Sequence, residues 1–271
     1  MAAPLVSDEL WSFVAPLLPP HAPRPKGGRP PVPDRACLTG ILLVLKTGIQ
    51  WEWLPQEMGC GSGMTCWRRL RDWHAAGVWD ELQRVLLARL QGAECLDWER
   101  AVMDASIVRA KGGGSVAAEA TGPNPTDRAR PGTKRHLVTD AQGIPLAPLL
   151  TPANRNAITV FERLLDAIPP VRGKVGRPRQ RPRKLHAEKA YDFPQARRAL
   201  ADRGIQARSA RRGVHSSARL GRHRWVVERT FAHLNQMRRL AVRYERRADI
   251  HQAFLTLGCC LLARSHLTRL C

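Results

Sequence analysis

The chain has 271 residues, and its 44 Lys and Arg against 23 Asp and Glu give a formal net charge of +21. Hydrophobic residues make up 44% of it, which excludes a disordered chain, because disordered segments lack the apolar residues that form a core. No apolar run reaches the roughly 18 residues that a membrane span needs, and the acidic N-terminus does not resemble a secretion signal. We therefore expect a cytoplasmic protein with no membrane partner, whose positive charge predicts a polyanionic partner such as nucleic acid.

Cysteine usage points the same way. The seven cysteines are odd in number and form no CxxC pattern, which favours reduced thiols. Cys60 and Cys66 have the spacing of half a zinc site, but no second Cys or His pair follows at a suitable distance. Cys259 and Cys260 lie in an apolar stretch and are expected in the core.

Charge and tryptophan are distributed unevenly along the chain. Residues 1–95 carry 10 basic and 9 acidic residues, whereas residues 96–271 carry 34 and 14. Seven of the eight tryptophans precede residue 99. Two compositions in one chain predict two domains, a nearly neutral one over 1–95 and a basic one over 96–271.

Apolar residues at helical spacing predict an all-α first domain with helices over 9–18, 34–46, 62–74 and 79–90. Ser62 is expected to cap the third helix, which carries Arg68, Arg69 and Arg71. A short helix, a turn and an arginine-bearing helix form the layout of a helix-turn-helix DNA reader. Because the net charge of this domain is near zero, an ordinary bundle with a solvated arginine face is the alternative.

Strand and helix patterns alternate in the second domain. Strands are predicted over 100–108, 134–139, 144–150, 184–187 and 205–209, and a turn at 140–143 predicts a hairpin. Helices are predicted over 157–168, 194–203, 222–240 and 250–266. A hairpin followed by alternating strands and helices predicts an α/β fold, with a mixed sheet flanked by helices.

Only five acidic residues lie among the 23 basic residues of segment 171–247. Asp202 and Glu245 have adjacent arginines, so we expect them to form surface ion pairs. Glu188 directly follows a predicted strand. Glu228 lies on a predicted helix, one turn after Arg224.

Asp104 lies inside a predicted strand, where an unpaired carboxylate is costly to bury. Asp104, Glu188 and Glu228 can meet at one edge of a mixed sheet, and such a cluster repels itself unless a cation neutralises it. Oxygen ligands favour Mg²⁺ or Mn²⁺, and two such ions about 4 Å apart would support phosphodiester cleavage. The alternative is that Asp104 is a polar strand residue and Glu228 a surface partner of Arg224.

Longer motifs occur in one order over nearly the whole chain. They are Leu10-Trp11, Leu17-Leu18-Pro19-Pro20, Gly40-Ile41-Leu42, Thr47-Gly48, Leu54-Pro55, Gly77-Val78-Trp79, Asp104-Ala105-Ser106, the segments 122–128 and 139–146, Glu188-Lys189-Ala190-Tyr191-Asp192 and the segment 223–231. Together these segments resemble the bacterial insertion-sequence DDE transposases.

The resemblance implies a ribonuclease-H-like catalytic core preceded by a helical DNA-binding module. It gives Asp104, Glu188 and Glu228 the positions of catalytic residues and ligands of Mg²⁺ or Mn²⁺. It further implies a homo-oligomer that binds terminal inverted repeats, nicks the element ends and joins the freed 3′-hydroxyl to target DNA. In the basic half, Lys189, Arg224 and Arg229 are expected to contact DNA phosphates.

Two features depart from this family. Glu188 occupies the position of an aspartate, which moves its carboxylate about 1.5 Å along the side chain, and a displacement of about 1 Å can cost roughly a hundredfold in rate. Segment 154–158 lacks the His-Asp pair of its relatives, and Asp192 is a possible substitute ligand. These departures leave two alternatives to an active transposase: a remnant that occupies DNA ends without cleavage, and a nuclease or resolvase of the same fold.

Overall fold

The computed structural model describes residues 4–21, 30–111, 120–173, 176–209 and 221–269. Its N-terminal part is helical, as predicted, with bounds close to the expected ones. The helices are α1 (Asp8–Val14), α2 (Asp34–Thr47), α3 (Gly63–Ala75) and α4 (Val78–Gly92), with the 3-10 turns η1 (Ala15–Leu17), η2 (Trp51–Trp53) and η3 (Gln56–Met58). The Ser62 hydroxyl accepts a hydrogen bond from the Thr65 amide at 3.2 Å, which confirms it as the cap of α3.

The connection between α2 and α3 differs from the compact helix-turn-helix. It spans residues 48–62 and includes η2 and η3, whereas the compact motif has a turn of three or four residues. The longer connection folds back tightly on α3, because a Cβ atom on Gly63 would lie 1.7 Å from the Trp51 carbonyl oxygen. Glycine at position 63 therefore allows η2 to lie against the start of α3.

This close approach makes position 63 sensitive to a single methyl group. Gly63→Ala is expected to lower the free energy of unfolding by at least about 1–3 kcal/mol, because the Trp51 backbone must move. Gly92→Ala is the matched control, since no atom lies within 4 Å of its Cβ position and alanine favours the helix. Urea denaturation measures both variants, and equal stability of Gly63→Ala and the native protein would contradict the packing described here.

A six-stranded mixed sheet forms the second part of the chain. Its strands are β1 (Ala101–Arg109), β2 (Gly122–Pro123), β3 (Pro131–Asp140), β4 (Pro145–Pro152), β5 (Lys184–Ala187) and β6 (Gln206–Ala207). The order is β4-β3-β1-β5-β6, and β2 pairs with the first residues of β3. Strand β3 is antiparallel to β1 and β4, while β5 is parallel to β1 and β6. This confirms the ribonuclease-H-like mixed sheet.

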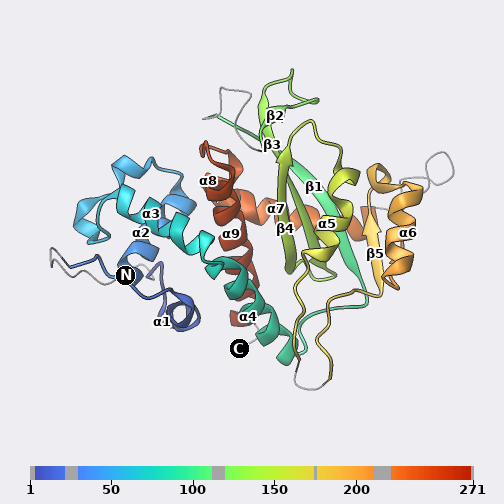
Figure 1. Ribbon diagram of the computed structural model, residues 1–271, viewed down its shortest axis with the longest axis horizontal. Coiled ribbons are helices and arrows are strands. Elements are labelled where there is room, and N and C mark those ends of the chain that lie inside the picture. The colour runs from blue at the N-terminus through green and yellow to red at the C-terminus, as the bar shows by residue number, and fades with distance from the viewer. Residues whose placement is uncertain (1–3, 22–29, 112–119, 174–175, 210–220, 270–271) are drawn as a thin grey trace.

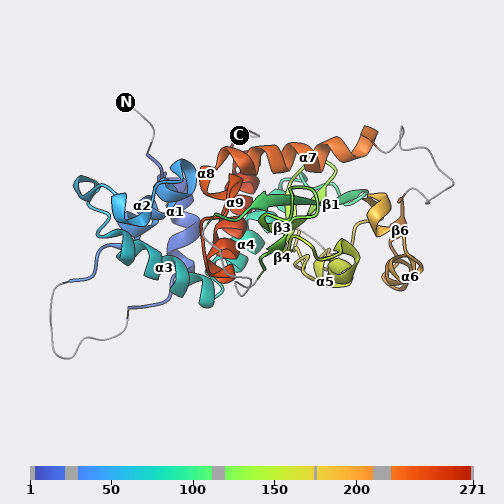
Figure 2. The ribbon, with the colours of Figure 1, turned by 90° about the horizontal axis from the view of Figure 1, so that it is seen from above.

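Helices cover both sides of this sheet. They are α5 (Phe161–Asp166), preceded by η4 (Ala157–Val160), α6 (Pro194–Asp202), preceded by η5 (Lys189–Tyr191), α7 (Gly221–Gln236), α8 (Arg238–Ala241) and α9 (Ala248–Thr268). Helix α7 runs along one face and α5 lies on the opposite side (Figure 2). The mixed α/β fold class is thereby confirmed.

One predicted helix is divided in two. The segment expected to be helical over 222–240 is interrupted at Met237, which has φ −82° and ψ 101°. After the interruption, Leu240 and Met237 pack closely on Gly258 of α9, where an added Cβ would lie 2.7 Å from Leu240 Cδ1. Tertiary packing against α9 thus replaces the continuous helix that the periodicity predicts.

Helix α9 lies between the helical module and the sheet (Figure 1). It packs against α3 and α4 on the module and against β4 on the sheet. Trp51 of the module stacks on Phe254 of α9 with ring centroids 5.8 Å apart, and the predicted core residues Cys259 and Cys260 are fully buried. One hydrophobic core crosses residue 95, and the division into two domains there stays a prediction.

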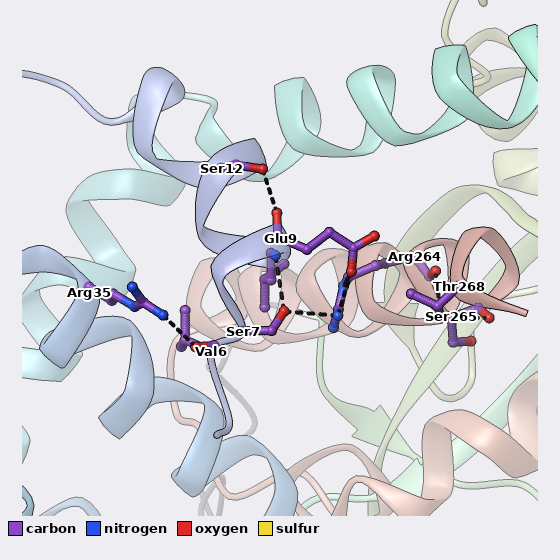
Figure 3. Close-up of polar contacts among 9 residues, drawn as sticks. Val6, Ser7, Glu9, Ser12, Arg35, Arg264, Ser265 and Thr268 are labelled. Carbon is purple, nitrogen blue, oxygen red and sulfur yellow. Dashed lines mark hydrogen bonds and ion pairs between the residues drawn. The ribbon is translucent and has the colours of Figure 1, made fainter. Parts of the chain in front are cut away.

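Polar contacts also join α9 to the start of the chain. Arg264 of α9 donates hydrogen bonds to the Ser7 hydroxyl at 2.9 Å and to the Glu9 carboxylate at 2.8 Å (Figure 3). Arg35 of α2 donates to the Val6 carbonyl at 3.1 Å. Helix α9 therefore holds the N-terminal end of α1 against the rest of the protein through Arg264.

The expected surface ion pair at Glu245 is wrong. Its carboxylate accepts a hydrogen bond from Arg239 Nε at 2.7 Å, and the side chains are only 7% and 5% exposed. Arg239 also donates to the Gly48 and Ile49 carbonyls, both at 3.1 Å. The pair is buried because α8 packs against the C-terminal end of α2, a contact that adjacent arginines in the sequence do not reveal.

None of the helices in the described ranges combines the length and the apolar character needed to cross a bilayer. Six cysteines fall within these ranges, and all six have free thiols. Cys271 lies outside them.

Candidate active site

The register of the sheet places Asp104 and Glu188 side by side. Strands β1 and β5 are parallel, with Met103 paired to Ala187, so Asp104 on β1 lies next to Glu188, which directly follows β5. Helix α7 packs on β1 and is fixed there just beyond Glu228. Thr230 donates a hydrogen bond to the Gly143 carbonyl at 2.9 Å, and Arg229 donates to the Gln142 carbonyl at 2.6 Å.

All three candidate catalytic carboxylates converge on the guanidinium of Arg224. Its Nη2 atom lies 3.0 Å from Asp104 Oδ2 and 3.4 Å from Glu228 Oε1. Its Nη1 atom lies 3.6 Å from Glu188 Oε1. Three segments far apart in sequence therefore form one ionic cluster, which we call the Arg224 cluster: Asp104, Glu188, Arg224 and Glu228.

The members of the Arg224 cluster differ in burial. The Asp104 side chain is 8% exposed, while those of Glu188 and Glu228 are 45% and 59% exposed. Asp104 is held further by a hydrogen bond from the Ala105 amide to its Oδ1 at 2.8 Å. The cluster thus has one buried, fixed carboxylate and two that face solvent, where a large substrate can approach.

The charge of Arg224 is stabilised by this arrangement. Burial lowers its pKa, but the negative charges of Asp104, Glu188 and Glu228 outweigh burial and raise the pKa above its usual value. One guanidinium formally compensates one of the three carboxylates. The Arg224 cluster therefore retains an attraction for further positive charge.

The oxygens of Asp104, Glu188 and Glu228 are suitable ligands for a divalent cation, although the distances between them now match contacts with the Arg224 guanidinium. Within the described ranges, no three His, Cys, Asp or Glu side chains are already placed to hold a metal ion. Asp104 Oδ2 and Glu228 Oε1 nevertheless contact the same nitrogen atom, so their separation cannot exceed the sum of those two contacts. Carboxylate oxygens around one positive centre are the ligands that Mg²⁺ and Mn²⁺ prefer.

Sequence reasoning missed two side chains near the candidate site: Tyr191, which interacts with members of the Arg224 cluster, and His186, which packs against the neighbour of Arg224, His223. Tyr191 is 2% exposed, and burial, followed by the charges of Asp104 and Glu188, raises the pKa of its hydroxyl. Burial and the nearby His223 and Arg100 lower the pKa of His186 to about 4, and His186 packs edge-on against His223 at 4.6 Å. Tyr191 belongs to the quoted motif 188–192, which was the available signal, whereas His186 had none.

The three predicted DNA-binding arginines of α3 have different surroundings. Arg69 contacts Asp34 at 3.4 Å and His21 at 3.1 Å, which joins α3 to the start of α2. Arg71 pairs with the adjacent Asp72 at 2.7 Å. Arg68 is exposed and lines a hollow of about 520 Å³ beside the N-terminus of α3, so it is the arginine best placed for an external phosphate.

Of the remaining candidates, Arg229 lies on α7, whereas Lys189 and Asp192 lie in or next to η5, after β5. Arg229 covers the ring of Trp225 at 4.7 Å, and Trp225 is 50% exposed. The side chain of Lys189 lies outside the described part of the chain. Asp192, the possible substitute ligand, accepts hydrogen bonds from Arg197 at 2.5 and 3.0 Å, so its charge is paired with that arginine.

Comparisons with known proteins cover both parts of the chain. Residues 6–83 match the family described as "Putative transposase of IS4/5 family", and residues 99–263 match the "Transposase DDE domain" family. The "Putative transposase for insertion sequence element IS402" of Burkholderia cepacia is 58% identical over 149 residues, which cover 55% of this chain and 71% of that protein. A 16.2 kDa IS402 protein of the same organism is 52% identical over 145 residues, covering 48% of this chain and 99% of that protein.

A solved structure of the pre-cleavage Mos1 transpososome also aligns with the chain. It covers 90% of this chain and 82% of that chain at 12% identity and a TM-score of 0.27, which is too low to match individual residues. The family matches and the IS402 relative do not depend on this alignment. They show that the chain belongs to the DDE transposase family, with an N-terminal part of the IS4/5 type.

Proposed function

We propose that this transposase cuts and joins DNA with a metal-dependent site formed by Asp104, Glu188 and Glu228. The convergence of these three carboxylates on one positive centre, Arg224, is the observation that carries the proposal. Buried and exposed carboxylates of this kind suit Mg²⁺ or Mn²⁺. Two bound ions would activate a water or a 3′-hydroxyl and stabilise the leaving oxygen.

The carboxylates and the basic residues around them have different proposed roles in this reaction. Asp104 is buried on a central strand, so it would hold the metal ions in a fixed position, and the ions would orient the reacting phosphate. Glu188 and Glu228 complete the ligand set from the solvent side. Arg229 and Arg224 on α7, together with Lys189, hold the DNA backbone next to the carboxylates, because phosphate contacts set the register of the duplex.

The proposed partners follow from this activity. The N-terminal helical module, with Arg68, Arg69 and Arg71, binds the inverted repeats at the element ends, and target DNA enters along the basic half. Joining two ends requires two active sites, so we infer a homo-oligomer assembled on DNA. We place this reaction in the cytoplasm, where bacterial DNA is found.

The decisive experiment uses linear DNA that carries the ends of the element together with a supercoiled target. We expect nicking at the ends in Mg²⁺ or Mn²⁺, no nicking with EDTA, and joined products once target is added. Cleavage without joining would identify a nuclease or resolvase. Salt-sensitive binding without any cleavage would identify a remnant that only occupies the ends.

Shortening the second carboxylate tests the departure at Glu188. Glu188 makes the longest contact with Arg224, at 3.6 Å, and its side chain is one methylene longer than aspartate. Glu188→Asp is expected to raise the nicking rate by up to about a hundredfold, if the extra length misplaces the ligand by about 1 Å. Single-turnover nicking measures it, and an unchanged or lower rate would show that the site has adapted to glutamate.

Salt dependence tests the role of the α3 arginines. Arg68→Ala is expected to weaken binding to the element ends and to reduce the slope of log affinity against log salt by about 1, because one phosphate contact is lost. Arg198→Ala is a matched control, an exposed arginine on α6 and away from the module. Fluorescence anisotropy at several salt concentrations measures both, and equal slopes for Arg68→Ala and native protein would remove Arg68 from the interface.

A further inference from the structure

Arg224 has an unusual position for a residue expected to bind DNA. Among the described residues, it is the one side chain in contact with all three carboxylates. Its side chain is 21% exposed, and its Nε atom is buried without a hydrogen-bond partner within the described ranges. In the metal-free protein the guanidinium is therefore engaged by the carboxylates, so it must leave them before it can contact a DNA phosphate.

The same carboxylates cannot hold Arg224 and a metal ion in one arrangement. The contacts to Asp104 and Glu228 measure 3.0 and 3.4 Å from one nitrogen, whereas Mg²⁺ requires oxygens at about 2.0–2.1 Å. A metal ion would have to lie between these oxygens, where Arg224 Nη2 now lies. Two positive charges at that distance repel each other strongly in a partly buried site.

We propose that Arg224 is the internal counter-cation of Asp104, Glu188 and Glu228 in the metal-free protein, and that it withdraws from them when a divalent ion binds. This inference rests on the proposed function, because it takes the three carboxylates as the metal ligands. Arg224 keeps three like charges together before metal arrives. Its withdrawal also frees a guanidinium beside the site for a DNA phosphate, which couples metal binding to DNA binding.

Exchange of cations has two measurable consequences. Removing the guanidinium strengthens metal binding, because the ion no longer displaces a bound cation. It also lowers the free energy of unfolding of the metal-free protein, because the three carboxylates then repel each other without a positive charge between them. If Arg224 had only a structural role, its removal would lower stability without strengthening metal binding. Loss of such a residue would disorder the ligands and weaken metal binding instead.

Mn²⁺ titration followed by electron paramagnetic resonance tests the first consequence on the full chain without DNA. We expect Arg224→Gln to bind Mn²⁺ about tenfold more tightly than the native protein. Arg224→Lys retains a charge but not the three-way contact, so an intermediate affinity is expected, and this variant decides the question if Arg224→Gln does not fold. Arg198→Gln, which removes an exposed charge on α6, is expected to match the native protein.

Thermal unfolding provides the second readout. The midpoint of metal-free Arg224→Gln is expected to lie about 2–4 °C below that of the native protein, with the difference removed by saturating Mn²⁺. Unchanged or weaker Mn²⁺ binding by both Arg224 variants would overturn the counter-cation role. Asp104→Asn separates the two proposals, because native Mn²⁺ affinity in that variant would instead overturn the metal site itself.

Discussion

Replacing Asp104 by asparagine is expected to reduce metal-dependent nicking by at least about a thousandfold. Asp104 is the buried member of the Arg224 cluster, with its side chain 8% exposed and fixed on β1. The amide has nearly the same shape but no negative charge, so the site loses its most rigid ligand. Metal stabilisation of a phosphoryl transfer provides several kcal/mol, and each 1.36 kcal/mol corresponds to a factor of ten in rate.

The comparison is sharpest with a matched substitution elsewhere. Asp202→Asn changes an exposed aspartate at the end of α6 and is expected to nick DNA at the native rate. Glu228→Gln is expected to behave like Asp104→Asn. Circular dichroism and DNA affinity must be preserved in each variant, and native nicking by Asp104→Asn would remove this residue from catalysis.

Replacing Glu245 by glutamine is expected to lower the free energy of unfolding by about 3–5 kcal/mol. Its carboxylate is the partner of buried Arg239, and a buried charge that loses its counter-charge is strongly destabilising. Arg239 also holds the Gly48 and Ile49 carbonyls at the end of α2. The loss therefore weakens the contact between the helical module and α8, and chemical denaturation measures it.

Two controls distinguish loss of charge from loss of packing. Glu57→Gln alters an exposed glutamate of η3 and is expected to change stability by less than about 0.5 kcal/mol. The double variant Arg239→Met with Glu245→Met is expected to regain much of the lost stability, because no unpaired charge remains. If Glu245→Gln lowered the free energy of unfolding by less than about 1 kcal/mol, the Arg239–Glu245 pair would instead be hydrated, contrary to its burial here.

Local signals predicted most of the elements in this chain. The alternation around Asp104 predicted β1, and the turn over residues 140–143 predicted the β3–β4 hairpin that the structure contains. Glu188 directly after a short strand and Glu228 on a helix were also placed from local pattern alone. These predictions succeeded because turn residues and hydrophobic periodicity act over a few residues.

The predictions that failed depend on contacts between distant segments. Helix 222–240 breaks at Met237, where Leu240 and Met237 pack on Gly258, and Glu245 is buried because α8 packs against α2. The ion pair between Arg69 and Asp34 is another contact between distant segments that local pattern did not predict, and the DNA-binding role of Arg69 stays a prediction. Neither burial nor a partner many residues away can be deduced from the sequence neighbours of a charged residue.

The sequence by itself determined the family, the order of strands and helices, and the three carboxylates that stand at its motif positions. Only the tertiary structure decided that these carboxylates meet at Arg224, which lies 120 residues from Asp104 along the chain. The physical reason is that strand order and helix packing choose which distant side chains become neighbours, whereas local periodicity fixes only the face on which each one lies.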